Sequence, residues 1–171
     1  MVTNPPPGYA TVAPWVVSRD TGSLLDFVTA AFGGTELARV PTADGGIGHA
    51  EIRVGDTILL AFDGQPDWPD TPSMLRIFVD DAEAAFERAL AAGARVVTPL
   101  DETAWGDRGG RVRDPQGHIW WVVEHFEDVP PDEMVARMKQ PRYAEAMTRA
   151  QATLDAELGS DGNDWSSPPV L

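Results

Sequence analysis

Residues 15–34 read WVVSRDTGSLLDFVTAAFGG, and residues 75–93 read LRIFVDDAEAAFERALAAG. Each stretch opens with an apolar strand pattern, continues with an aspartate that can cap a helix, and ends an apolar helical stripe at glycine. The capping residues Asp20 and Asp81, and the glycines Gly33 and Gly93, correspond at an offset of about sixty residues. An internal repeat of this kind determines the fold more strongly than any local pattern.

Three further strand patterns follow each predicted helix. A strand over 36–40 and a hairpin of 47–54 with 57–63 complete the first copy, whose opening strand is expected over 9–18. In the second copy the strands are 75–79, 95–99, 111–113 and 118–126, with a loop at 105–110 and a type I turn at 114–117. The sequence therefore predicts an α+β fold of two βαβββ modules that form a half-barrel, followed by a C-terminal helical extension.

Shifts in composition divide the chain into segments. Proline-rich residues at the start predict an extended arm, and the stretch GQPDWPDTP has the residues of a linker. After Val129 two helices are expected, because prolines open each one and a regular apolar stripe runs from Tyr143 to Leu158. The predicted segments are the arm 1–8, module one 9–63, the linker 64–72, module two 73–127, the C-terminal helices 128–158 and a disordered tail 159–171.

Composition excludes several classes of function. The chain has 171 residues, 43% of them hydrophobic, which suits one domain with an extension. It has no apolar run of about 18 residues and no signal-peptide pattern, so we expect a cytoplasmic protein without a membrane partner. A formal charge of −14 disfavours binding to nucleic acid. The absence of cysteine excludes disulfides and thiolate-ligated metals.

The repeat, the DPQGH turn at 114–118 and the GHAEIRVGD hairpin at 48–56 together resemble the vicinal oxygen chelate superfamily. This superfamily contains glyoxalases, extradiol dioxygenases and bleomycin-resistance proteins. The WGDRGG stretch at 105–110 and EDVPPDEMVARM at 127–138 look most like PhnB-like glyoxalase/bleomycin-resistance proteins. The resemblance covers about residues 8–140. It implies a homodimer, because such proteins pair or swap their modules and because long strand edges need cover.

Metal-using members of that superfamily place one ligand on each of four strands. Alignment on the capping aspartates and on the Asp114–Gly117 turn puts those positions on Ala13, Leu59, Met74 and Trp121. None of these side chains can hold a hard divalent cation, which needs carboxylate or imidazole donors. The resemblance and this departure from it therefore imply no metal and no cofactor.

Side chains alternate along a strand, so the ligand positions that the resemblance implies indicate which side chains face the concave side. They put there Trp15 of the first strand, Leu59 and Ala61 of the fourth, Arg76 and Phe78 of the fifth, and Trp121 of the last. On the third strand the apolar set should pack on the helix, which leaves the polar set with His49 and Glu51 on the concave side. The predicted ligand-binding residues are Trp15, His49, Glu51, Arg76, Phe78, Trp105 and Trp121. We expect the indoles of Trp15 and Trp121 to stack on an aromatic ligand, and Trp105 to lie on a mobile lid. The alternatives are that the tryptophans fill the half-barrel and that residues 105–108 form an ordinary loop salt bridge.

Three classes of function fit these features. The leading hypothesis is a metal-independent small-molecule-binding protein that sequesters an aromatic antibiotic or metabolite, as bleomycin-resistance relatives do. The second is a lyase, isomerase or dioxygenase, either with an unorthodox metal site or by acid–base catalysis with His49 and Glu51 as catalytic candidates. Two such residues are too few for a metal site by themselves. The third is a structural or regulatory dimer whose pocket is vestigial.

Overall fold

The protein is described by a computed structural model that covers residues 2–159, so most of the expected disordered tail, residues 160–171, lies outside the described residues. The predicted α+β fold of two βαβββ modules with C-terminal helices is confirmed. Module one consists of β1 (Trp15–Ser18), α1 (Thr21–Phe32), β2 (Thr35–Pro41), β3 (Ile47–Val54) and β4 (Thr57–Asp63). Module two consists of β5 (Met74–Phe78), α2 (Ala82–Ala91), β6 (Arg95–Glu102), β7 (Asp107–Arg113) and β8 (Ile119–His125). The chain continues with α3 (Pro131–Met138) and α4 (Pro141–Leu158).

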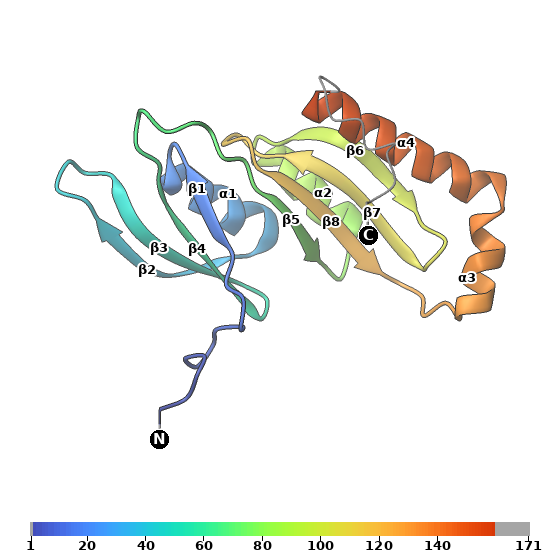
Figure 1. Cartoon of the computed structure of the whole chain (residues 1–171), viewed down its shortest axis with the longest axis horizontal. Helices are drawn as coiled ribbons and strands as arrows, with labels where there is room; N and C mark the ends of the chain where they lie inside the picture. The colour runs from blue at the N-terminus through green and yellow to red at the C-terminus, as the bar shows by residue number, and fades with distance from the viewer. Residues whose placement is uncertain (1, 160–171) are drawn as a thin grey trace, which may run out of the picture.

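The two sheets have the same topology and remain separate. Their strand orders are β1-β4-β3-β2 and β5-β8-β7-β6, with one parallel pair in each sheet. No ladder joins one sheet to the other within residues 2–159, so the described chain does not close a barrel. The sheets lie side by side, with α1 and α2 behind them and in contact with each other (Figure 1). No helix in this part of the chain is long and apolar enough to cross a membrane.

The helices begin where the sequence predicted. The carboxylate of Asp20 accepts a hydrogen bond from the Ser23 N–H at 2.9 Å, and that of Asp81 accepts one from Ala84 N–H at 2.9 Å. These bonds satisfy donors that a helix N-terminus otherwise leaves unpaired. The stop residue Gly33 has a φ of 69°, in the left-handed region that favours glycine. Local capping chemistry is thus repeated in both modules.

One continuous core lies between the helices and the sheets. It includes Val16 and Ala61 from module one and Trp120 and Val122 from module two. Trp120 is 2% exposed, and its indole N–H donates to the Asp114 carboxylate at 2.8 Å. The buried indole therefore keeps a hydrogen-bond partner while its ring contributes to the core.

Three predicted strand boundaries were wrong by three residues or more. The strand predicted over 95–99 runs on to Glu102, and the other two lie at β1 and β7. The first strand begins at Trp15 rather than at residue 9, since Pro14, which has no N–H, immediately precedes it and only the Pro14 carbonyl bonds to Leu60. The expected loop at 105–110 is largely strand, because β7 already begins at Asp107. Gly110 lies within that strand, where an added Cβ would stand 2.7 Å from the Thr98 carbonyl oxygen. The paired glycines allow close strand approach, and the sequence pattern had suggested a loop instead.

The predicted parity is correct for β1, β3, β5 and β8 and wrong for β4. Leu60 is in register with Trp15 and with Glu51, so it shares their concave face. Leu59 pairs with Ile52 and belongs to the core that packs on the helices. Residues 58–61 are all buried and apolar, so the sequence of β4 shows no alternation from which the register could be derived.

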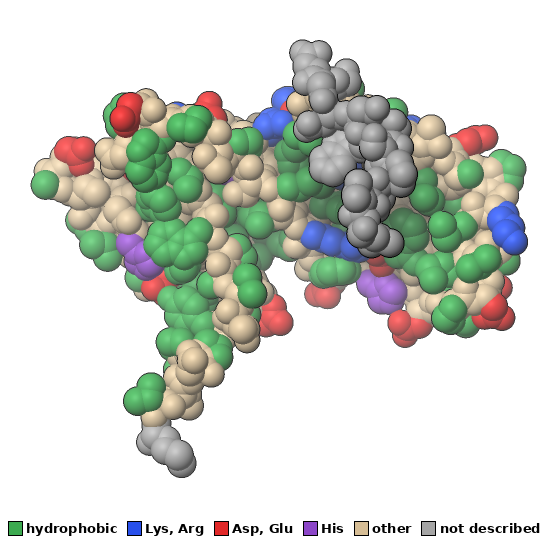
Figure 2. Space-filling view, in the orientation of Figure 1, with side chains coloured by type: hydrophobic (Ala, Val, Ile, Leu, Met, Phe, Trp, Pro, Cys, Tyr) green, Lys and Arg blue, Asp and Glu red, His purple; other side chains and the backbone are tan. Residues whose placement is uncertain are grey.

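The helix α4 packs on module two. It runs along β6, and Tyr143 and Ala146 are its buried side chains (Figure 1). Residues 2–7 of the N-terminal arm extend away from module one (Figure 1 and Figure 2). The prediction that α4 is docked on the body is therefore confirmed, and its docking brings a helix to the concave side of one module.

Candidate functional site

A row of three side chains crosses the concave face of module two. Arg76 on β5 and Arg111 on β7 are both in register with Trp121 on β8. Their guanidinium carbons lie 4.7 Å and 4.5 Å from the centre of the indole, one from each neighbouring strand. Cation–π attraction favours this arrangement. Both arginines therefore pack against the Trp121 indole, and stacking of a ligand on this ring stays a prediction.

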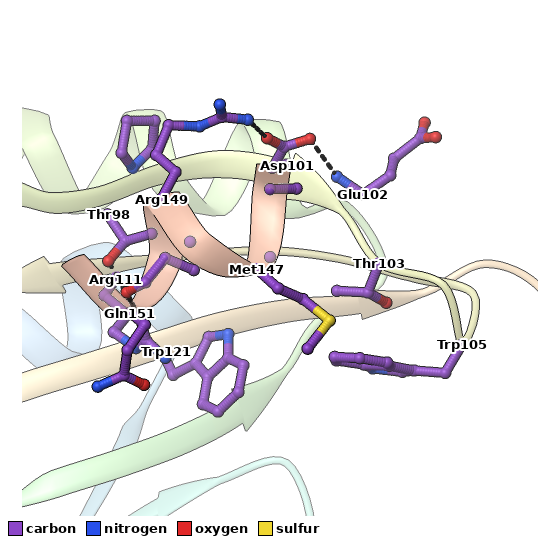
Figure 3. A pocket seen from close by; sticks show the side chains of 15 residues that line it. Thr98, Asp101, Glu102, Thr103, Trp105, Arg111, Trp121, Met147, Arg149 and Gln151 are labelled. Carbon is purple, nitrogen blue, oxygen red and sulfur yellow. Dashed lines mark hydrogen bonds and ion pairs between the residues drawn. The ribbon is translucent and has the colours of Figure 1, made fainter. Parts of the chain in front are cut away.

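A cavity of about 160 Å³ lies between this sheet and α4. Its walls include Trp105, Trp121, Arg111 and, from α4, Met147. In Figure 3 the end of the Met147 side chain lies between the indoles of Trp121 and Trp105. An added Cβ at Gly109 would stand 3.1 Å from the Trp121 indole nitrogen, so the glycine leaves room for the ring. The cavity is concave and mainly aromatic and apolar, which is typical of sites for organic ligands.

The buried carboxylate of Asp107 fixes one wall of this cavity. Its Oδ2 accepts hydrogen bonds from the Trp105 indole at 2.8 Å and from Arg76 at 2.5 Å. Its Oδ1 lies 2.7 Å from Nδ1 of His125. Hydrogen bonds to Asp107 and then to Asp128 raise the pKa of His125 above its ordinary value. Asp107 therefore holds Trp105 in the turn between β6 and β7, and the mobility expected of this segment stays a prediction.

Polar contacts hold α4 over the sheet. Arg111 donates to the Ala150 carbonyl at 2.8 Å, and the hydroxyls of Thr98 and Thr153 are 2.7 Å apart. Arg149 on α4 also pairs with Asp101 on β6. These partners are 39 to 55 residues apart in sequence. Sequence reasoning missed Met147 and Arg111 as cavity residues, because the apolar stripe predicted a packed helix without showing which face it would cover.

Module one carries a different row on its concave face. Trp15 on β1 and Glu51 on β3 are both in register with Leu60. The His49 Nε2 lies 3.1 Å from the Glu51 carboxylate, and the rings of Trp15 and His49 are 5.9 Å apart. Hydrogen bonds from Tyr9 and then from His49 lower the pKa of Glu51. The result is an ionised carboxylate beside an imidazole, under a tryptophan that is 53% exposed.

The predicted site residues therefore fall into two groups. Arg76, Phe78, Trp105 and Trp121 lie together in module two, where Arg76 also stands 4.7 Å over the Phe78 ring. Trp15, His49 and Glu51 lie together in module one. Among residues 2–159 no hydrogen bond or ring contact joins the two groups. The contact of α1 with α2 leaves the two sheets side by side, so the two groups of side chains stand apart within one chain.

The residues present do not fit the metal site of metal-using superfamily members. Ala13, Met74 and Trp121 have no carboxylate or imidazole donor, and Leu59 faces the core. Its concave-facing neighbour, Leu60, is equally apolar. The described part of the chain contains no group of three His, Cys, Asp or Glu side chains able to hold a metal ion. Divalent metals in proteins need such donors.

Comparison with known proteins gives consistent matches. The model of the Glyoxalase/Bleomycin resistance protein/Dioxygenase superfamily matches residues 9–122, which leaves α3 and α4 outside the match. The Mycobacterium bovis protein Mb0911c, described as uncharacterized, is 41% identical over 138 residues, or 74% of this chain and 91% of that protein. The solved structure of TioX from Micromonospora sp. ML1 is 32% identical, with a TM-score of 0.56, over 67% of this chain and 99% of TioX. A PhnB protein from Bacillus cereus shares the fold at 16% identity, with a TM-score of 0.56, over 67% of this chain and 99% of its own.

Proposed function

The chain belongs to the glyoxalase/bleomycin resistance protein/dioxygenase superfamily, and from this premise we propose that it is a metal-independent protein that binds a small aromatic molecule. The observation that carries the proposal is the cavity between the concave face of module two and α4, with Trp105, Trp121 and Met147 in its walls. The lack of donor side chains at the ligand positions supports binding without a metal. An aromatic antibiotic or metabolite is the ligand class.

The size of the cavity limits what it can hold. At about 160 Å³ it is smaller than the roughly 300–1,000 Å³ of sites for drug-sized ligands. It therefore suits a ligand of about one ring, or one ring of a larger molecule. Trp105 is the ring wall whose orientation is fixed, through its bond to Asp107, and Met147 supplies an adaptable apolar contact.

A homodimer would bring the two groups of site residues together. Trp15, Met74 and Phe78 are 53%, 47% and 62% exposed on the open faces, and exposed apolar patches of this kind favour an interface. Glu51 in module one would meet the arginine row of module two from a second copy. We propose that module one of each copy covers module two of its partner, so that Trp15, His49 and Glu51 complete the pocket.

Light scattering tests the dimer. We expect a mass of about twice the 18.5 kDa of one chain at micromolar concentration. Phe78→Asp would place a charge in the proposed interface and should release monomers. Val135→Asp changes a residue of α3 that is 51% exposed and serves as the control. A monomeric wild-type protein would refute the shared pocket and leave the cavity of module two as the proposed site.

Ligand binding is tested by a thermal-shift screen of flat aromatic compounds, since a ligand that prefers the native state raises its melting temperature. Hits are then titrated into the wild-type protein and into the Met147→Ala variant, with tryptophan fluorescence as the readout. We expect the variant to bind about tenfold more weakly, which is about 1.4 kcal/mol. Met138→Ala is the matched control, because Met138 is 42% exposed, close to the 40% of Met147, and lies outside the cavity. Equal affinity of both variants would place the binding site elsewhere.

Acid–base catalysis by His49 and Glu51 is the second candidate, favoured by their 3.1 Å contact. With its pKa lowered, Glu51 would orient His49, and His49 would transfer the proton. His49→Gln separates the two functions. An enzyme would lose turnover of a bound compound and keep most of its affinity, whereas a binding protein shows no turnover before or after the substitution.

A further inference from the structure

Arg111 is a buried cation that has no acidic partner among residues 2–159. Only 7% of its surface is exposed, and it lines the cavity under α4. Its Nη1 donates to the Thr98 hydroxyl at 3.1 Å and to the Ala150 carbonyl at 2.8 Å, both of which are neutral acceptors. Its Nε is buried with no acceptor among the described residues. The guanidinium therefore retains donors that the described chain does not use.

Burying an unpaired charge is unfavourable, so its retention needs an explanation. Burial lowers the pKa of Arg111, yet an arginine guanidinium stays protonated in proteins at neutral pH. The neighbouring arginines of the concave face and of α4 differ in this respect, since Arg76 pairs with Asp107 and Arg149 pairs with Asp101. Arg111 alone in this group of three has only neutral protein partners within residues 2–159.

The acidic residues of the cavity do not neutralise Arg111. Asp101 pairs with Arg149, and its other oxygen accepts from the Glu102 N–H (Figure 3). Glu102 pairs with Arg142 and Arg108. Asp101 and Glu102 are therefore each paired with other arginines. The positive charge of Arg111 has no carboxylate partner among the residues that line the cavity.

We propose that the cavity under α4 binds the carboxylate of a small aromatic acid, with Arg111 as the anion-binding residue and Trp105 and Met147 against the ring. The inference rests on the proposed function and names its ligand class. A guanidinium binds a carboxylate through charge-assisted hydrogen bonds, and the Nη2 of Arg111 has no hydrogen-bond partner among the described residues. The net charge of −14 does not oppose this contact strongly, because charges beyond about 8–10 Å are screened at physiological salt.

The test uses the full chain and two probes of the same shape, benzoate and neutral benzamide, titrated by tryptophan fluorescence. We expect benzoate to bind at least about tenfold more tightly, which is about 1.4 kcal/mol. The preference should weaken at high salt only modestly, since a buried contact is poorly screened. This comparison needs no variant, so it stands even where a substitution disturbs folding.

Variants then assign the preference to one residue. Arg111→Met should reduce benzoate binding to the level of benzamide without changing benzamide. Arg88→Met removes the same charge from α2, where Arg88 donates to the Ala31 carbonyl outside the lining of this cavity, and should leave the preference intact. Arg111→Lys retains the charge without the fork and should keep part of the preference.

The outcomes separate this inference from the proposed function. Equal binding of benzoate and benzamide, or a preference that survives in folded Arg111→Met, overturns the anion site while aromatic binding stands. Failure of both probes when neutral aromatic compounds bind in the screen has the same meaning. Failure of every aromatic compound overturns the proposed function and this inference with it.

Discussion

The two modules have the same topology, but they carry opposite charges at one pair of equivalent positions on their concave faces. The row Trp15–Leu60–Glu51 crosses the concave face of module one, and the row Arg76–Trp121–Arg111 crosses that of module two in the same register. Where module one has a carboxylate, module two has a guanidinium. The two modules thus share their backbone arrangement, whereas the side chains on their concave faces differ.

The modules also differ in what covers them. In module two the helix α4 forms one wall of the cavity, whereas Trp15 in module one is 53% exposed. The sequence repeat ends before α4 begins, so nothing in module one corresponds to this helix. A cavity with a buried cation is therefore a property of module two and its extension together.

The largest expected effect separates two adjacent tryptophans of module two. Trp120→Ala should lower the free energy of unfolding by about 3–5 kcal/mol, because a fully buried ring leaves a cavity in the shared core. Trp121→Ala should lower it by about 1 kcal/mol, because the indole is partly exposed on the concave face. Urea unfolding of both variants measures the difference. Equal losses would mean that Trp121 belongs to the core and not to a site.

Truncation compares the two terminal extensions. Ending the chain after Val129 removes α4 and exposes the surface against Tyr143 and Ala146, which should lower stability by about 2 kcal/mol. For a chain of this size the melting temperature should fall by about 4–8 °C. Deleting residues 1–7, of which 2–7 are exposed, should change stability by less than about 0.5 kcal/mol. Calorimetry measures the melting temperature of each truncated chain. If both melted at the temperature of the wild-type protein, the result would contradict this comparison.

Neutralising one charge in each row tests how much that row contributes to the stability of the fold. Arg76→Gln should lower the free energy of unfolding by about 1–2 kcal/mol, because the buried Asp107 loses a charged partner. Glu51→Gln should lower it by less than about 1 kcal/mol, since its contact with His49 is partly exposed. Both values come from denaturant melts. A larger effect in module one would reverse the proposed distinction.

The smallest expected effect is a pH dependence that belongs to module two. Since Asp107 and Asp128 raise the folded-state pKa of His125, the protonated native state is favoured. This contribution is complete below the unfolded pKa of about 6.5 and is lost as pH rises through the higher folded pKa. His125→Gln should therefore reduce the fall in melting temperature between about pH 6 and pH 8. An unchanged slope in the variant would show that other groups carry this dependence.

The sequence alone determined the scaffold. Capping at Asp20 and Asp81, the apolar stripes of the helices and the alternation of β1, β3, β5 and β8 are local signals, since each depends on neighbours within one turn or one strand. They were enough to predict two modules and a docked C-terminal helix, whereas the ligand positions came from the resemblance to the superfamily. Where the local signal was absent, as in the uniformly apolar β4, the register was wrong.

Only the tertiary structure decided the site. Whether an arginine is paired depends on carboxylates far along the chain, and α4 supplies Arg111 with a neutral carbonyl 39 residues away. The separation of Trp15 from Trp121 likewise follows from the packing of α1 on α2, which no single segment specifies. Periodicity in a sequence reports which side of an element is buried, whereas the choice of the element that buries it depends on contacts between segments distant in the chain.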